Sequence, residues 1–194
     1  MNRDDLLAAL EAYVPSSPAE AASLDRIRSF VSAPEDPFAR ENPEGHVTGS
    51  AVVARPDGSA FLLVHHRKLR RWLQPGGHTD AADSSVYETA LREAREETGI
   101  SRFGSPLSDA ILDVDVHAIP AHGGDPAHSH FDVRYLVTSE ETVHAENAED
   151  PARPMRWMSL EEARSRGADA SLLRALGKAR ALLTGEGEST AEAQ

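Results

Sequence analysis

Cysteine is absent from this chain of 194 residues. Its absence excludes structural disulfides, thiolate metal sites and a cysteine nucleophile. No apolar run approaches the roughly 20 residues that a membrane span needs. The first residues, Met-Asn-Arg-Asp-Asp, lack the apolar core of a signal peptide. We therefore expect a cytoplasmic protein that does not bind a membrane.

Positive charge is also scarce. Lysine and arginine number 20 against 32 aspartate and glutamate residues, which gives a formal net charge of −12. Such a surface repels a polyanion, so we expect no binding of a nucleic-acid polymer. It would also repel a small nucleotide diphosphate, unless divalent cations bridge the negative charges of the two.

The hydrophobic pattern predicts an α/β sandwich, with helices before, between and after the strands of a mixed sheet. The first two helices have apolar residues at helical spacing, namely Leu6, Leu7, Leu10 and Val14, then Leu24, Ile27, Phe30 and Val31 after Pro18. Strands are predicted at residues 46–55, 61–64, 110–119, 131–137 and 155–158. Further helices are predicted after Ser159 and over residues 172–183.

The domain organisation follows from these elements. We expect residues 1–44 to form an N-terminal helical extension, residues 45–184 the main domain and residues 185–194 a disordered tail. We expect the extension to be a structural cap of the fold, and the alternatives are that it lines a substrate site or forms a contact in a homodimer.

One stretch joins a glycine-rich loop to a helix. Gly76 and Gly77 open the loop, Asp83 or Ser84 is the expected N-cap, and Gly99 is expected to end the helix in the left-handed conformation. The helix has a modest apolar stripe formed by Val86, Ala90, Leu91 and Ala94.

Three carboxylates crowd the last turns of this predicted helix. Glu93 and Glu97 lie one above the other, and Glu96 sits roughly 60° to one side. They repel one another near the negative end of the helix dipole, and Arg92 and Arg95 offset only part of that repulsion. They are either a solvated face with weak ion pairs or a set of hard oxygen ligands for Mg²⁺ or Mn²⁺.

The stretch from Gly77 to Ile100 resembles the signature box of the Nudix hydrolases. The run Arg-Glu-Ala-Arg-Glu-Glu-Thr-Gly-Ile at residues 92–100 matches the second half of that box at every fixed position. The resemblance implies a Nudix-type α/β/α sandwich with a mixed sheet. It also implies metal-dependent hydrolysis of the diphosphate linkage in a nucleoside diphosphate joined to another group. The alternative is a nucleotide-sensing module with little or no turnover, a role that some relatives have.

The first half of the box departs from the family pattern. Gly77 lies one residue too far from Arg92, so the loop carries an insertion. The box's first glutamate is replaced by Ser84, or by Asp83 if the insertion lies after it. The run Gly-Gly-His-Thr-Asp at residues 76–80 is similar to a bacterial variant of the box.

The resemblance assigns roles to individual residues. The metal ligands would be Glu93, Glu96, Glu97 and a backbone oxygen of the glycine pair, taken as Gly77. Arg92 would orient a glutamate through an ion pair. The general base stays open among Glu96, an acid of the loop at residues 140–141 and a histidine. The catalytic residues expected from the resemblance are Glu96, Arg92 and Glu97.

A basic run at residues 65–72 precedes the loop. Its cations either balance the acidic helix or contact substrate phosphates through charge-assisted hydrogen bonds. The candidates for phosphate contact are Arg67, Lys68, Arg71 and, within the loop, His78. His78 has a second interpretation as a structural hydrogen-bonding residue of the turn.

Nine histidines suggest a further metal site. His128 and His130 alternate on a predicted strand and so point to the same face, where they could share one ion such as zinc. The sequence fixes no third ligand, so we expect a solvated junction between loop and strand rather than a zinc site.

Overall fold

A computed structural model describes residues 1–33, 35–67, 69–121, 126–141, 149–150 and 152–186. Contacts divide the chain into two compact units. The first unit contains Met1–Ser50, Gly76–Glu93 and Asp109–Tyr135, and the second contains Ala51–Pro75, Ala94–Ser108 and Leu136–Gln194. Lys68 and most of the predicted tail lie outside the described residues.

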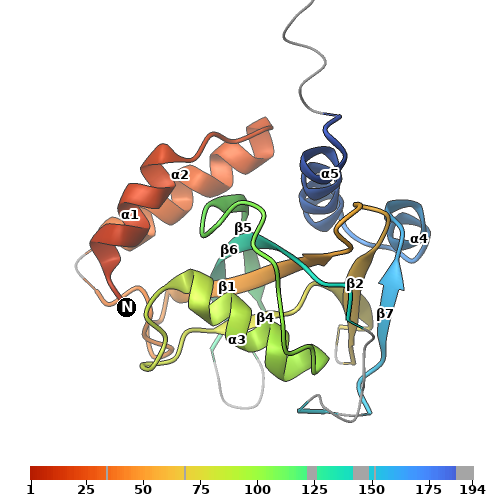
Figure 1. Ribbon diagram of the computed structural model, residues 1–194. Helices are drawn as coiled ribbons and strands as arrows, with labels where there is room; N and C mark the ends of the chain where they lie inside the picture. The colour runs from red at the N-terminus through yellow and green to blue at the C-terminus, as the bar shows by residue number, and fades with distance from the viewer. Residues whose placement is uncertain (34, 68, 122–125, 142–148, 151, 187–194) are drawn as a thin grey trace, which may run out of the picture. The chain divides into compact units, whose positions relative to one another are not determined.

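The first unit begins with the two predicted helices, α1 (Arg3–Ala12) and α2 (Pro18–Ser32), which lie against each other (Figure 1). Ser17 caps α2, and Pro18 occupies its first turn. Proline is tolerated there because an amide in the first turn has no carbonyl partner within the helix, and because the fixed φ of proline is already helical. The apolar stripe of α2 is buried as predicted. Val14 is 82% exposed, contrary to prediction, since α1 ends at Ala12 before Val14 could join the stripe.

The strands of the first unit form two antiparallel pairings. The first half of β1 (Gly45–Ala54) pairs with β4 (Gly76–His78), and β5 (Ile111–Ile119) pairs with β6 (His128–Thr138). β4 was predicted as part of a loop. It is a strand because its peptide groups bond to β1, with Thr48 opposite His78 and Gly49 opposite Gly77. That pairing sets the direction in which His78 leaves the backbone.

A buried ion cluster joins the strands of this unit. Arg134 donates hydrogen bonds to Asp113 at 3.1 Å and to Asp132 at 2.9 Å, and all three are almost fully buried. Thr48 and Ser50 of β1 donate to the same Asp132, at 3.0 and 2.7 Å. Asp113 is fully buried, and its pairing with Arg134 offsets the cost of burying its charge. The cluster therefore joins side chains that lie on one side of the sheet formed by β1, β6 and β5.

The second unit contains the remaining strands and the C-terminal helices. The second half of β1 forms a hairpin with β2 (Phe61–His66), and β2 also pairs antiparallel with β3 (Arg71–Leu73) and β7 (Met155–Met158). Helix α4 (Leu160–Ser165), predicted after Ser159, opens with a capping box of Ser159 and Glu162, and α5 (Ala170–Thr184) follows. The strand order of the sheet is β3-β2-β1-β6-β5.

Helix α3 (Val86–Thr98) is continuous, with residues up to Glu93 in the first unit and the rest in the second. Ser85, rather than Asp83 or Ser84, caps it, because the Glu88 amide donates to the Ser85 hydroxyl at 3.2 Å. Gly99 ends the helix with a φ of 69°, as predicted. Within the described residues, no helix is both long enough and apolar enough to span a bilayer.

Candidate functional site

The centre of the candidate site in the first unit is Arg92. Its Nε and one terminal nitrogen donate to the two carboxylate oxygens of Asp83, each at 3.0 Å, and its other terminal nitrogen donates to Glu93 at 2.8 Å. It also donates to the backbone oxygen of His78 at 2.8 Å. A planar guanidinium with four such bonds has a fixed orientation. Arg92 therefore holds the Glu93 carboxylate in place.

Asp83 is the residue that fixes Arg92. Its side chain is almost fully buried and also accepts hydrogen bonds from the amide of Asp80 and the hydroxyl of Thr89. Burial alone would raise the pKa of this carboxyl, but the bonds from Arg92, Asp80 and Thr89 outweigh burial and lower it. Of the two positions that stand in for the box's first glutamate, Asp83 is the one in contact with Arg92, and Ser84 is exposed.

Gly77 lies directly against the Glu93 carboxylate. A Cβ atom added at Gly77 would lie 2.5 Å from the carboxyl carbon of Glu93 and 2.6 Å from both of its oxygens. Only a residue without a side chain allows this approach. Two of the predicted metal ligands in the first unit are thus neighbours, and the backbone of β4 contacts the acid.

The other two acids lie on the part of α3 in the second unit. Glu96 and Glu97 are half-buried, and Arg153 donates a hydrogen bond to Glu97. The Glu149 amide donates to the backbone oxygen of Glu96 at 2.7 Å, so Glu149 and Arg153 both contact the end of α3. Sequence reasoning missed Arg153, because it is 56 residues from its partner and belongs to no motif.

Two arginines of the basic run, Arg67 and Arg71, have carboxylate or carbonyl partners. Arg67 donates to the Ala152 carbonyl at 2.7 Å and lies 3.7 Å from Asp150, and Arg71 lies 3.7 Å from Asp169. Both arginine side chains are 59% exposed, so both can also be reached from solvent. Of the alternative general bases, Glu141 accepts hydrogen bonds from Ser101 and Arg102.

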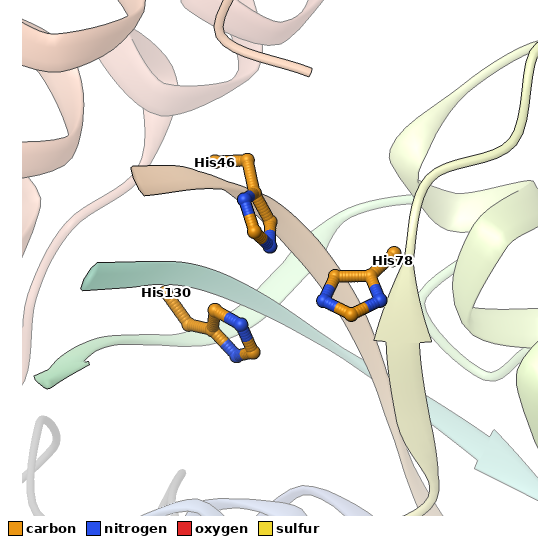
Figure 2. Close-up of side chains that lie close together, drawn as sticks. All are labelled: His46, His78 and His130. Carbon is orange, nitrogen blue, oxygen red and sulfur yellow. The ribbon is translucent and has the colours of Figure 1, made fainter. Parts of the chain in front are cut away.

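The first unit also brings three histidines together, which we call the histidine cluster: His46, His78 and His130. They come from β1, β4 and β6, and Figure 2 shows their rings facing one another. Ring centroids are 4.6 Å apart for His46 and His78, 4.9 Å for His46 and His130, and 5.2 Å for His78 and His130. One nitrogen of each ring lies within 4.8 Å of the others.

Burial keeps the rings of the cluster neutral. It lowers the pKa of His46 and of His78 to about 4 and that of His130 to about 2, and the neighbouring histidines add to the effect. A neutral His78 would contact a phosphate only as a hydrogen-bond donor. His128, predicted as a partner of His130, lies beside the cluster with its ring 5.2 Å from that of His130. Sequence reasoning missed His46, because nothing marked it beyond its place at the start of a strand.

Comparison with known proteins decides the family. The family model described as NUDIX domain matches residues 45–176. The chain belongs to the Nudix hydrolase family. A curated Nudix relative is the uncharacterized Nudix hydrolase NudL of Yersinia enterocolitica, 43% identical over 53 residues. That match covers 25% of this chain and 27% of the relative, so the chain spans about a quarter of the curated relative it matches.

Solved Nudix structures share the fold. The Ap4A hydrolase of C. elegans has a TM-score of 0.50 at 22% identity, covering 71% of this chain and 97% of that one. A MutT Nudix hydrolase from Burkholderia pseudomallei has a TM-score of 0.50 at 23% identity, covering 68% of this chain and 95% of that one. The MutT protein of Methanosarcina mazei Go1 gives 0.50 at 19% identity, with 73% and 94% covered. The predicted Nudix family and its α/β/α fold with N-terminal helices are confirmed.

Proposed function

We propose that this Nudix protein hydrolyses the diphosphate linkage of a nucleoside diphosphate joined to another group, with Mg²⁺ or Mn²⁺ as the cofactor. The supporting observation is the Glu93 carboxylate, which Arg92 holds against the backbone of Gly77. This arrangement fixes the orientation of an anionic ligand. Arg92 is in turn held by Asp83, which is buried. A merely solvated acidic face would not need this second layer of hydrogen bonds.

The donor atoms fit a hard divalent cation. Glu93, Glu96 and Glu97 occupy little more than one turn of α3, and we assign them, with the backbone oxygen of Gly77, as the ligands. Carboxylate and carbonyl oxygens are the ligands that Mg²⁺ and Mn²⁺ prefer. When bound, the cation supplies Lewis-acid catalysis at the phosphates.

The residues of the chain have separate roles in the proposed reaction. Asp83 holds Arg92, and Arg92 orients Glu93. Glu96 is our candidate for the general base, since it lies on the same helix and Glu141 is bound by Ser101 and Arg102. The predicted phosphate contacts are still Arg67, Arg71, Lys68 and His78. We add Arg153, because its guanidinium lies beside Glu97 and could donate hydrogen bonds to a phosphate oxygen.

The proposed substrate is a small nucleotide or another diphosphate. A net charge of −12 disfavours a nucleic-acid polymer, whereas a cation held at α3 would offset the charge of a short diphosphate. The cytoplasmic location, the homodimer and the division into residues 1–44, 45–184 and 185–194 stay predictions of the sequence.

The alternative function is a nucleotide-sensing module without turnover. The observation that favours it is the pairing of Glu97 with Arg153, which engages one proposed ligand. Calorimetry showing tight nucleotide binding, with no product formed over the same period, would select this alternative.

The test is turnover of a panel of nucleoside triphosphates, dinucleoside polyphosphates and nucleotide sugars with Mg²⁺ or Mn²⁺, with products identified by mass spectrometry. We expect cation-dependent cleavage between phosphates in the wild type and its loss in Glu93→Gln. The matched control is Glu88→Gln, an exposed acid on the same helix. Equal turnover in wild type and Glu93→Gln would exclude α3 from the mechanism.

A further inference from the structure

We propose that the histidine cluster is a binding site for a transition-metal ion, with Zn²⁺ as the best match, separate from the oxygen ligands of α3. His46, His78 and His130 reach one another from β1, β4 and β6, and their closest nitrogens all lie within 4.8 Å (Figure 2). All three belong to the first unit, so the site lies within one compact part of the chain. The proposal does not depend on the proposed hydrolase activity.

The first argument is the hydrogen bonding of His46. Its side chain is 3% exposed, and neither Nδ1 nor Nε2 has a hydrogen-bond partner among the residues that the structure describes. A neutral imidazole has one donor and one acceptor nitrogen, and burying both without partners is unfavourable. The T-shaped or tilted ring contacts with His78, His128 and His130 give neither nitrogen a hydrogen bond. A metal ion would bind the acceptor nitrogen and so remove part of this cost.

The second argument is the way the strands aim the rings. Alternate residues of a strand share a face, so His46 lies on the face of β1 that carries Thr48 and Ser50. His130 lies on the face of β6 that carries Asp132 and Arg134. Thr48 and Ser50 both donate to Asp132, so these residues of β1 and β6 lie on the same side of the sheet. The convergence of His46 and His130 is therefore a consequence of buried strand contacts and not of a mobile surface.

The third ligand is held by the candidate site already described. His78 stands opposite Thr48 in the pairing of β4 with β1, and Arg92 donates to its backbone oxygen at 2.8 Å. The ring of His78 turns toward His46, with an interplanar angle of 63°. All three ligands thus have backbones held by strand pairing, as a preformed site requires.

The chemistry of the cluster selects the class of ion. Three neutral imidazoles offer nitrogen lone pairs, and the chain has no thiolate to compete. Nitrogen ligands of this kind suit Zn²⁺, Cu²⁺ and Ni²⁺, whereas Mg²⁺ takes oxygen ligands. The histidine cluster would therefore bind transition-metal ions, and the acidic helix would bind Mg²⁺ or Mn²⁺.

The geometry needs only small movements of the side chains. Tetrahedral Zn²⁺ with Zn–N bonds of ~2.0–2.1 Å places its ligand nitrogens roughly 3.3 Å apart, compared with at most 4.8 Å here. Rotation of the three rings about their side-chain torsions would close that difference. His128 lies next to the cluster, with its Nδ1 2.9 Å from the Pro126 oxygen, which leaves Nε2 for the fourth position. Otherwise water would occupy that position.

The test measures zinc directly. The chain of 194 residues is stripped with a chelator, desalted, equilibrated with one equivalent of Zn²⁺ and passed over a chelating resin. The retained metal is then measured by mass spectrometry. We expect about one zinc per chain in the wild type, and at least a roughly 100-fold weaker affinity in His46→Phe combined with His130→Phe. Equal retention by wild type and this double variant, or no retention by the wild type, would overturn the proposal.

Two controls separate this site from other histidines and from α3. His65→Ala removes a half-buried histidine that packs on Trp72 in the second unit, and it should retain zinc as the wild type does. The triple variant Glu93→Gln, Glu96→Gln and Glu97→Gln should also retain zinc although it would lose the proposed hydrolase activity. Loss of zinc in either control would place the ion elsewhere and contradict the proposal.

Thermal unfolding keeps the proposal falsifiable if the double variant folds poorly. Zn²⁺ should raise the melting temperature of the wild type, because an ion that binds only the folded state stabilises it. The single variant His46→Phe should unfold at or above the melting temperature of the metal-free wild type, since it removes unpaired buried nitrogens, and should not respond to Zn²⁺. An unchanged response to Zn²⁺ in His46→Phe would overturn the proposal.

Discussion

The acidic helix and the histidine cluster are both candidate cation sites, yet the polar groups of the two sites differ in their hydrogen bonding. On α3, two of the three acids accept hydrogen bonds from arginines: Arg92 donates to Glu93 and Arg153 donates to Glu97. In the cluster, His46 has no partner for either ring nitrogen among the described residues. Carboxylates must be balanced by positive charge when half-buried, whereas imidazoles can become neutral instead. These two acids of α3 are therefore paired with arginines, whereas the histidine cluster contains buried ring nitrogens without hydrogen bonds in the described part of the chain.

The largest expected effect tests the acid side of this comparison. Glu97→Gln should lower the rate of diphosphate hydrolysis at least about 100-fold, because the amide is a neutral and weaker ligand than the carboxylate. Steady-state kinetics with Mn²⁺ measure the loss. Glu88→Gln is the control and should keep the wild-type rate, and a similar loss in both variants would indicate a general effect of charge on α3.

The next effect tests whether Asp83 is the support of Arg92. Asp83→Ala should lower hydrolysis about 10- to 100-fold, the usual cost of losing a residue that orients a metal ligand. Ser84→Ala, one residue further on and exposed, should have the wild-type rate. The same assay run on both variants decides between the two positions left open by the sequence. A larger loss in Ser84→Ala would contradict the role given to Asp83.

The close approach of Gly77 to Glu93 gives a steric test. Gly77→Ala would push the carboxylate away, so hydrolysis should fall about tenfold while the melting temperature changes little, because a flexible side chain gives way. Gly177→Ala is the matched control, since nothing lies within 4 Å of its new methyl group. That helical change should raise the free energy of unfolding by about 0.5–1 kcal/mol without affecting the rate.

The smallest effect sharpens the comparison most directly. If Arg153 competes with the cation for Glu97, Arg153→Ala should lower the Mn²⁺ concentration needed for half-maximal hydrolysis by a few-fold. Titration of activity with Mn²⁺ measures this shift. Arg156→Ala removes a more exposed arginine from β7 and should leave the requirement unchanged. A higher Mn²⁺ requirement in Arg153→Ala would mean that Arg153 supports the site.

Much of the fold could be predicted because its signals are local. The helices at α2 and α5 follow from apolar spacing, and the capping box of α4 follows from Ser159 and Glu162. The short strand β4 could not be predicted in this way, since three residues with two glycines have little strand propensity and depend on pairing with β1. The prediction for Val14 was wrong because the apolar spacing continues past Ala12, where the helix ends.

The candidate site divides along the same line. Glu93, Glu96 and Glu97 could be named from the sequence because a helix places neighbours three and four residues apart together. Arg153 and the choice of Asp83 over Ser84 depended on contacts that no spacing records. The histidine pair predicted at residues 128 and 130 lacked a third ligand, and only the pairing of β4 with β1 brought His78 to His46 and His130.

The sequence by itself determined the Nudix family, the acidic helix and most of the elements, since each depends on residues close together along the chain. The tertiary structure alone decided which arginine meets which acid and which three histidines converge. The physical reason is that ion pairs and ligand sets are formed between strands and loops far apart in sequence, whose register is set by backbone pairing and by buried contacts such as Asp132 with Ser50.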